Sequence, residues 1–191
     1  MERANSLPIG QRYINRFIIY SALGTPYVDL QKWRLTIDGE VEQTLTLTYK
    51  ELLSQQSWCE VIRDFHCVTK WSVPSVKFEG VKLKTLIAKA RPKPAAKYVL
   101  FGCLDGYTTV VPIEDALSDA ALIALKIDGQ PLRIEQGFPA RPFIPHLYAW
   151  KSAKWLHLIR ILREYVDGYW EARGYHERGN VWSEERFKKE I

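Results

Sequence analysis

Short strand-like segments that end at turn residues recur along this chain, and they constrain its fold more than any other feature. Strands are indicated at residues 33–37, 44–47, 61–68, 98–101 and 107–111, and short helices at 48–53, 81–90 and 113–117. The two kinds of segment do not alternate regularly, as they would in a parallel α/β sheet. The chain has 191 residues, the length of one ordinary domain. The sequence therefore predicts a single mixed domain of the α+β class.

Side-chain chemistry marks the ends of several segments. Thr48 and Glu51 have the spacing of a capping box, which predicts a helix that begins directly after Thr48. Asp105 and Gly106 predict a hairpin turn between two strands. Pro74 predicts that the strand before it is followed by a broken loop.

The remaining segments are assigned by composition. Residues 154–162 fit the helical period and the strand period equally well, so both readings stay open. The tail from Glu164 onward is rich in aromatic and charged residues, and we expect it to wrap the surface. We divide the chain into an N-terminal arm, residues 1–30, packed on a domain formed by residues 31–191.

The cysteine content and the N-terminal sequence bear on the location of the protein. Cys59, Cys67 and Cys103 cannot form a complete disulfide framework. The first residues contain no apolar core of a signal peptide, and no apolar run approaches the length of a membrane span. We therefore expect a cytoplasmic protein with reduced thiols and no membrane span.

The formal net charge of +5 raises the question of an anionic partner. The lysines and arginines are dispersed, and the longest basic run is the pair Lys188 and Lys189. No motif of a DNA- or RNA-binding module is present. Nucleic-acid binding is thus disfavoured, whereas an anionic cofactor or small-molecule substrate remains open.

Cys67 stands at the end of a predicted strand, where a side chain can reach a cleft while its backbone stays fixed. Its thiol could be a small buried hydrophobic group, a nucleophile or a metal ligand. His66 is its neighbour and points to the opposite face of a strand, so a direct Cys–His pair is disfavoured. The chain has no CxxC or HExxH motif, so a zinc site is not indicated.

A second group of polar residues lies between Gly137 and Trp155. Arg141 offers a planar fork suited to phosphate, Lys154 a point charge and Ser152 a hydroxyl. These side chains could equally be solvated surface groups. Of these two hypotheses, phosphate binding is the more specific.

These separate signals come together in a resemblance. Residues 64–72, around Cys67, resemble the cysteine loop of small molybdoproteins with the sulfite oxidase fold. The likeness extends, in the same order, through residues 105–108, 137–141, 147–148, 151–155, 168–171, 174–176 and 182–187. It covers about residues 30 to 187. The resemblance implies the sulfite oxidase molybdopterin-binding fold, with molybdenum and molybdopterin as the cofactor.

The resemblance also implies roles for two residues at the metal. Cys67 matches the cysteine that ligates molybdenum, and a thiolate is a soft, strongly donating ligand. Tyr175 falls where sulfite oxidase-like enzymes carry a tyrosine beside the metal, so we expect it to form a hydrogen bond with a substrate oxygen or with the oxo ligand. Both are candidate catalytic residues.

Five residues are expected to bind the cofactor in addition to Cys67. Arg141 and Lys154 match basic residues that bind the pterin phosphate in this family, with Ser152 beside them. Gln136 stands where many relatives have histidine, and it can hydrogen-bond but cannot carry charge. His66 completes the expected set because it adjoins the metal ligand.

The implied function is two-electron oxygen-atom transfer with a sulfite-, sulfoxide- or N-oxide-type substrate. The chain carries no haem-attachment or iron–sulfur cysteine pattern, so a separate electron-transfer protein is expected. One alternative is a non-catalytic molybdopterin-binding protein or a subunit of a larger redox complex. Another is a cysteine-dependent hydrolase, which requires a histidine within hydrogen-bond reach of Cys67.

Overall fold

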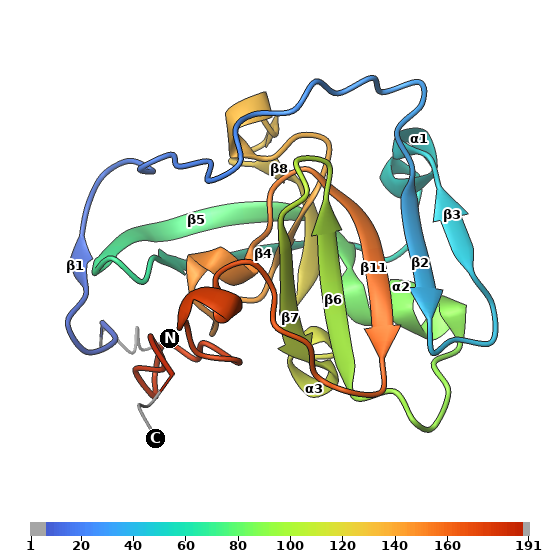
Figure 1. The fold of residues 1–191 in the computed structure, drawn as a ribbon. Coiled ribbons are helices and arrows are strands. Elements are labelled where there is room, and N and C mark those ends of the chain that lie inside the picture. Colours follow the sequence, from blue (N-terminus) through green and yellow to red (C-terminus); the bar gives the residue numbers. More distant parts are fainter. Residues whose placement is uncertain (1–6, 189–191) are drawn as a thin grey trace.

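The computed structural model describes residues 7–188 and places their strands in two sheets (Figure 1). The first sheet contains β1 (Arg12–Tyr13), β4 (Trp58–His66), β5 (Trp71–Lys82), β8 (Leu122–Ile127), β9 (Gln130–Pro131) and β10 (Arg141–Phe143). The second contains β2 (Leu35–Gly39), β3 (Leu45–Leu47), β6 (Tyr98–Cys103), β7 (Thr108–Pro112) and β11 (Leu156–Leu162). The helices are α1 (Tyr49–Leu53), α2 (Leu83–Ala90) and α3 (Ile113–Ala116), with single 3₁₀ turns η1 (Ile134–Gln136), η2 (Ala149–Lys151) and η3 (Glu171–Arg173).

Both sheets mix strand directions. In the first sheet β5 pairs with β4 and β8 antiparallel and with β1 parallel. The second sheet has the order β3-β2-β11-β6-β7, in which β11 pairs parallel with β2 and antiparallel with β6. This double pairing explains why residues 156–162 are a strand although their period was ambiguous. The prediction of a mixed α+β domain is confirmed.

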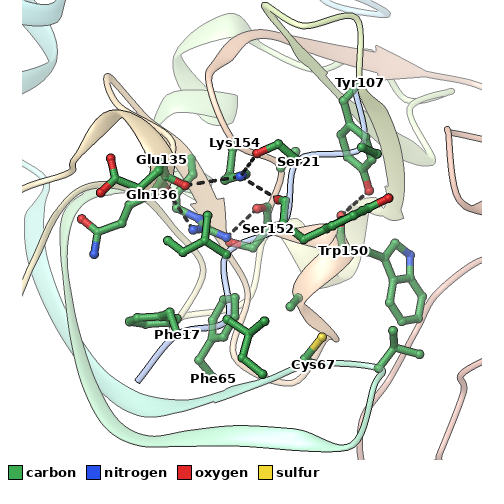
Figure 2. A pocket seen from close by; sticks show the side chains of 18 of the residues that line it. Phe17, Ser21, Phe65, Cys67, Tyr107, Glu135, Gln136, Trp150, Ser152 and Lys154 are labelled. Atoms are coloured by element: carbon green, nitrogen blue, oxygen red, sulfur yellow. Dashed lines mark hydrogen bonds between the residues drawn. The ribbon is translucent and has the colours of Figure 1, made fainter. Parts of the chain in front are cut away.

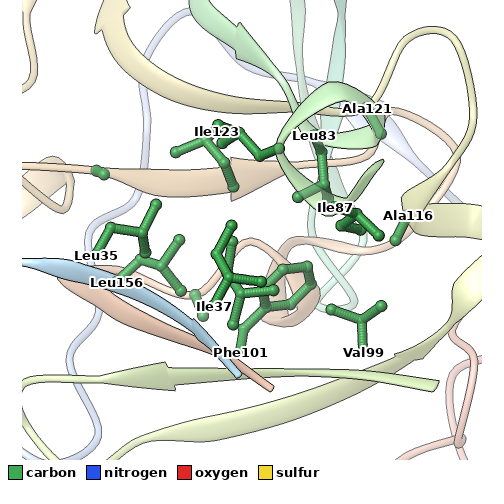
Figure 3. Packing of buried hydrophobic residues seen from close by; sticks show 14 of the residues in the cluster. Leu35, Ile37, Leu83, Ile87, Val99, Phe101, Ala116, Ala121, Ile123 and Leu156 are labelled. Atoms are coloured by element: carbon green, nitrogen blue, oxygen red, sulfur yellow. The ribbon is translucent and has the colours of Figure 1, made fainter. Parts of the chain in front are cut away.

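The main hydrophobic core lies between the second sheet, α2 and one face of β8 (Figure 3). Strand β8 is buried on both faces. Its Ile123 and Leu125 join this core, while Leu122 and Ala124 pack into a second cluster on the opposite face, as the period of a strand requires. The second cluster contains Phe65 and supports one wall of the cavity described below.

Most element ends follow the local signals. Helix α1 begins after Thr48, and both hydrogen bonds of the capping box with Glu51 are present, which confirms that prediction. The hairpin turn at Asp105 and Gly106 joins β6 to β7, also as predicted. Helix α2 begins two residues later than expected, because the preceding residues continue the pairing of β5 with β8.

The expected break at Pro74 is wrong, since this proline lies inside the long strand β5. The register of β4 and β5 shifts here, so that Pro74 and Ser75 lie opposite Asp64 in a bulge. A proline is tolerated in a bulge because its missing N–H is not needed for the ladder. The backbone N–H of Ser75 donates instead to the Asp64 carboxylate at 2.9 Å.

The N-terminal arm and the C-terminal tail form the two ends of the described chain. Between β1 and β2 the arm runs as a long irregular trace across the top of Figure 1. The tail was expected to wrap the surface, but Glu171, Val181 and Arg186 are buried, because the tail packs against η2 and the turn after β4. No helix within residues 7–188 is long and apolar enough to cross a membrane.

Candidate active site

A cavity of about 480 Å³ opens beside the first sheet, and segments far apart in the sequence form its walls (Figure 2). Its size suits an organic cofactor or a substrate of similar dimensions. The lining includes six of the residues predicted as site residues, namely Cys67, Gln136, Arg141, Ser152, Lys154 and Tyr175. Tertiary structure thus brings together residues that the sequence spreads over more than half of the chain.

Cys67 occupies the tight turn between β4 and β5. Its carbonyl accepts from the N–H of Lys70 at 3.1 Å, and its own N–H donates to Trp71 O at 2.9 Å. Lys70 has a positive φ of 70°, which lets the turn close. The Sγ atom lies 3.2 Å from Thr69 Oγ1 and faces the cavity. The thiol is therefore held by a fixed backbone and remains accessible to a ligand.

His66 lies outside this cavity, which corrects the expectation that it contacts the cofactor directly. Its ring is buried, with Nδ1 2.8 Å from Ser72 Oγ, and it is not among the residues that line the cavity. Neighbouring side chains of an extended chain face opposite ways, so Cys67 and His66 do not line the same wall.

The histidines that would support a hydrolase also have other partners. His146 Nε2 lies 2.8 Å from Asp115 Oδ1, and His176 Nδ1 accepts from the backbone N–H of Arg178 at 3.1 Å. Neither of them, nor His66, is among the residues that line the cavity. This geometry does not support a Cys–His nucleophile at Cys67.

Arg141 is a buried cation whose fork is held by three hydrogen bonds. Its Nε donates to Ser152 Oγ at 3.0 Å, its Nη1 to Gln136 O at 2.8 Å and its Nη2 to Ser152 O at 2.8 Å. The guanidinium has two further N–H groups that can donate to a ligand. Burial lowers its pKa to about 10, so the group stays charged at neutral pH. The Ser152 hydroxyl donates to Pro142 O, and so Ser152 orients Arg141.

Lys154 is the second cation of the site, and its ammonium has only neutral partners among the described hydrogen bonds. Nζ donates to Tyr20 O at 2.8 Å, to Ser21 Oγ at 2.7 Å and to Glu135 O at 3.3 Å. Burial, together with the nearby charge of Arg141, lowers its pKa to about 8. Within residues 7–188 neither cation forms a salt bridge, so an anion bound here would offset the desolvation of both.

Gly137 permits the close approach of η1 to Lys154. Its φ of 107° belongs to the left-handed region, and a Cβ at this position would lie 3.0 Å from Lys154 Cα. The backbone N–H of Trp155 donates to the Gly137 carbonyl at 3.2 Å. Gln136, directly before the glycine, uses its amide oxygen for the N–H of Arg133, which leaves its NH₂ group as the donor for a ligand.

Aromatic side chains surround the Cys67 end of the cavity. The Tyr175 ring lies 4.9 Å from Trp170 and 5.2 Å from Trp150, centroid to centroid. Cys67, Trp170 and Tyr175 pack against the same small hydrophobic cluster. Burial, and then the proximity of Cys67, raises the pKa of Tyr175. Its phenol therefore stays protonated at neutral pH and can donate a hydrogen bond.

A buried ion pair beneath the site escaped the sequence analysis. Lys151 and Glu171 have side chains 1% and 0% exposed, and Lys151 Nζ donates to Glu171 Oε1. The same carboxylate oxygen accepts from Thr109 Oγ1 at 2.6 Å and from Trp150 Nε1 at 3.3 Å. The pair ties η2 to the tail and so fixes the segment that carries Ser152. No spacing rule could have shown it, because the partners meet only through the fold.

The arm also supplies part of the cavity wall that sequence patterns did not indicate. Residues 17–22 all line the cavity. Phe17 packs edge-on against Phe65, with ring centroids 5.2 Å apart. The one available signal was the unbroken apolar run from Phe17 to Tyr20.

The fold and the site define a class of protein. Two cations without a salt-bridge partner among the described residues, the buried Arg141 and the half-buried Lys154, suit the phosphate of an anionic organic cofactor. The fixed thiol of Cys67, which lies away from Lys154 in the same cavity (Figure 2), suits a metal. The molecule is thus a metal-cofactor oxidoreductase domain. The chain belongs to the family described as the oxidoreductase molybdopterin binding domain, whose model matches residues 22–170. The predicted family, molybdenum and molybdopterin as the cofactor, and an oxidoreductase activity are confirmed.

Comparisons with individual proteins agree. The chain is 36% identical to the uncharacterized oxidoreductase YuiH of Bacillus subtilis over 97% of this chain and 94% of that protein. It is 29% identical to the protein-methionine-sulfoxide reductase catalytic subunit MsrP of Campylobacter jejuni, over 78% of this chain and 55% of that protein. The sulfane dehydrogenase SoxCD from Paracoccus pantotrophus matches with a TM-score of 0.69 at 22% identity, over 84% of this chain and 47% of its own. This likeness confirms the fold.

Lys154 should make cofactor binding dependent on pH. In the cofactor-free protein its pKa is about 8, and a bound phosphate would raise that pKa, so only the protonated lysine binds well. Affinity should be full below about pH 8 and should fall by on the order of tenfold per pH unit above it. Equilibrium dialysis of loaded protein, followed by fluorescence of the released and oxidised pterin, measures this profile.

The matched control for this prediction is Lys154→Arg, which keeps the charge at every pH tested. Its retention curve should lose the fall above about pH 8, because arginine is not deprotonated in that range. Parallel curves for the wild type and this variant would show that Lys154 does not bind the phosphate.

Proposed function

We propose that the chain catalyses two-electron oxygen-atom transfer and reduces neutral S-oxide or N-oxide substrates. One observation carries this proposal: the cavity wall around Cys67 is mostly aromatic and aliphatic, while Lys154 lies at the other end (Figure 2) and Arg141 is bonded to Gln136 and Ser152. For a sulfoxide the balanced reaction consumes two electrons and two protons and yields a sulfide and water.

A sulfite-type substrate fits this wall less well. An oxyanion that approaches the metal would need a cation beside it to offset its desolvation. Arg63, the arginine nearest to Cys67 in the preceding strand, is exposed, donates to Ile62 O and is not among the lining residues. The name of the Campylobacter relative, a methionine-sulfoxide reductase subunit, supports the choice of a sulfoxide. Because the chain spans just over half of that relative, its activity is carried over only as a proposal.

The residues of the site then take distinct roles. Cys67 would give the protein's thiolate ligand to molybdenum when the cofactor is bound. Arg141 and Lys154 hold the pterin phosphate, with the Gln136 amide as a further donor. When bound, the cofactor supplies the two-electron redox chemistry. Tyr175 donates a hydrogen bond to the oxide oxygen of the substrate and thereby orients it.

A separate electron-transfer protein completes each turnover in this proposal. The cavity mouth is bordered by exposed residues of the arm, so that a redox partner can approach the cofactor without displacing the core. A cytoplasmic location with reduced thiols is part of the same proposal. It is supported by the three cysteines, all of which are free in the fold.

The proposal is tested with protein produced in a host that synthesises the cofactor. Molybdenum content is first measured by elemental mass spectrometry. Reduction of dimethyl sulfoxide and trimethylamine N-oxide is then assayed with a reduced viologen, and sulfite oxidation with an artificial acceptor. We expect oxide reduction to exceed sulfite oxidation at least about 100-fold in kcat/KM, a difference of about 3 kcal/mol. Preferential sulfite oxidation, or turnover of none of these by fully loaded protein, would contradict the proposal.

A further inference from the structure

Residues 17–22, which we call the strap, line the cavity, and Ile18, Ile19 and Tyr20 within the strap are also exposed to solvent. All but one of them precede the segment that matches the family model, which begins at residue 22. They nonetheless line the same cavity as the thiol of Cys67. The strap therefore adds to the site a wall that belongs to the N-terminal arm and not to the matched domain.

The strap is held near both of its ends. Phe17 packs edge-on against Phe65 on the floor of the cavity. At the other end Lys154 Nζ binds the carbonyl oxygen of Tyr20 and the hydroxyl of Ser21. Because Tyr20 contributes its carbonyl to this anchor, its phenol ring is not needed to hold the strap in place.

Tyr20 is 67% exposed, yet it lines the same cavity as the aromatic residues around Cys67. Its centroid is 6.4 Å from that of Trp170, with the two planes tilted by 37°. Trp170 in turn lies 4.9 Å from Tyr175, and both pack with Cys67 against one hydrophobic cluster. The three rings form a row that leads from the mouth of the cavity to the thiol.

We propose that Tyr20 is a specificity-determining residue, which with Trp170 binds the apolar substituent of an S-oxide substrate. This inference rests on the proposed reduction of S-oxides. Aromatic faces attract other rings and thioether sulfur beyond the effect of buried area alone. With its substituent on these two rings, the substrate directs its oxide oxygen inward toward Tyr175. Substrates with a flat apolar group are then favoured over small ones.

The test compares two sulfoxides on the molybdenum-loaded protein. Methyl p-tolyl sulfoxide carries a ring that can lie on Tyr20, whereas dimethyl sulfoxide does not reach it. In Tyr20→Ala the ratio of kcat/KM for the aryl substrate to that for the small one should fall roughly 5- to 10-fold, mainly through KM. Tyr20→Phe should restore the ratio. Tyr27→Ala is the matched control, because Tyr27 is 90% exposed on the same arm and is not among the lining residues.

A binding measurement separates this inference from the proposed function. The affinity for the product, methyl p-tolyl sulfide, is measured by calorimetry on wild type and Tyr20→Ala, with molybdenum content determined for each. Weaker sulfide binding in the variant would support the role of Tyr20 even if no sulfoxide were reduced, in which case the proposed function alone would fail. An unchanged sulfide affinity together with an unchanged substrate ratio would overturn the inference. So would an equal fall in kcat for both substrates, which is the signature of a purely structural role.

Discussion

Replacing Cys67 with serine is expected to abolish turnover while leaving the fold intact. A serine hydroxyl is a hard, weakly donating ligand and cannot replace a thiolate on molybdenum. Changes to groups that merely support metal ligands already cost about 10- to 100-fold, so loss of the ligand itself should cost more than about 100-fold in kcat. Turnover per chain and molybdenum content are measured on the same preparation.

The fold should tolerate this change, because the Cys67 side chain is half-exposed and its Sγ forms a hydrogen bond with the neighbouring Thr69, which a serine hydroxyl can also make. The free energy of unfolding should stay within about 0.5 kcal/mol of wild type, as for other substitutions outside the core. Cys59→Ser is the matched control, since Cys59 lies on β4, the strand that leads to Cys67, but does not line the cavity. If Cys67→Ser kept full activity, Cys67 would not be the metal ligand.

Breaking the buried pair of Lys151 and Glu171 should have the largest effect on stability. Each single change, Lys151→Met or Glu171→Gln, removes one partner and leaves a desolvated group without its countercharge. Such losses destabilise proteins by about 3–5 kcal/mol. Burial already lowers the pKa of Lys151 against the opposing effect of Glu171, so the lysine depends on its partner to remain charged. Urea unfolding measures the change in the free energy of unfolding.

The double variant distinguishes this pair from two independent contributions. Because neither charge then remains buried, Lys151→Met with Glu171→Gln should destabilise by less than the sum of the single changes. The exposed pair of Lys84 and Asp119 provides the control, and Lys84→Ala should cost less than about 1 kcal/mol. Single variants of the buried pair within about 1 kcal/mol of wild type would contradict its structural role.

The consequence for function is that stability and site geometry depend on the same groups. Lys151 directly precedes Ser152, which orients the Arg141 fork. Glu171 directly follows Trp170, whose ring belongs to the aromatic wall. Loss of the ion pair should therefore weaken cofactor retention even in molecules that remain folded.

Local sequence determined the parts of this protein that depend on neighbouring residues. The capping box of Thr48 and Glu51 and the hairpin turn at Asp105 were predictable, because caps and turns are decided by a few consecutive side chains. The motif around Cys67 gave the family and the cofactor, since a metal ligand needs a particular residue type at a fixed place. Five further predicted residues line the same cavity as Cys67.

Only the tertiary structure decided which distant groups meet. It placed Pro74 in a bulge and made residues 156–162 a strand through pairing on both sides. It also joined Lys151 to Glu171 and laid the strap across the site. The physical reason is that strand register and buried ion pairs arise from contacts between segments that are distant in the sequence. A local sequence pattern does not show which distant segments come into contact.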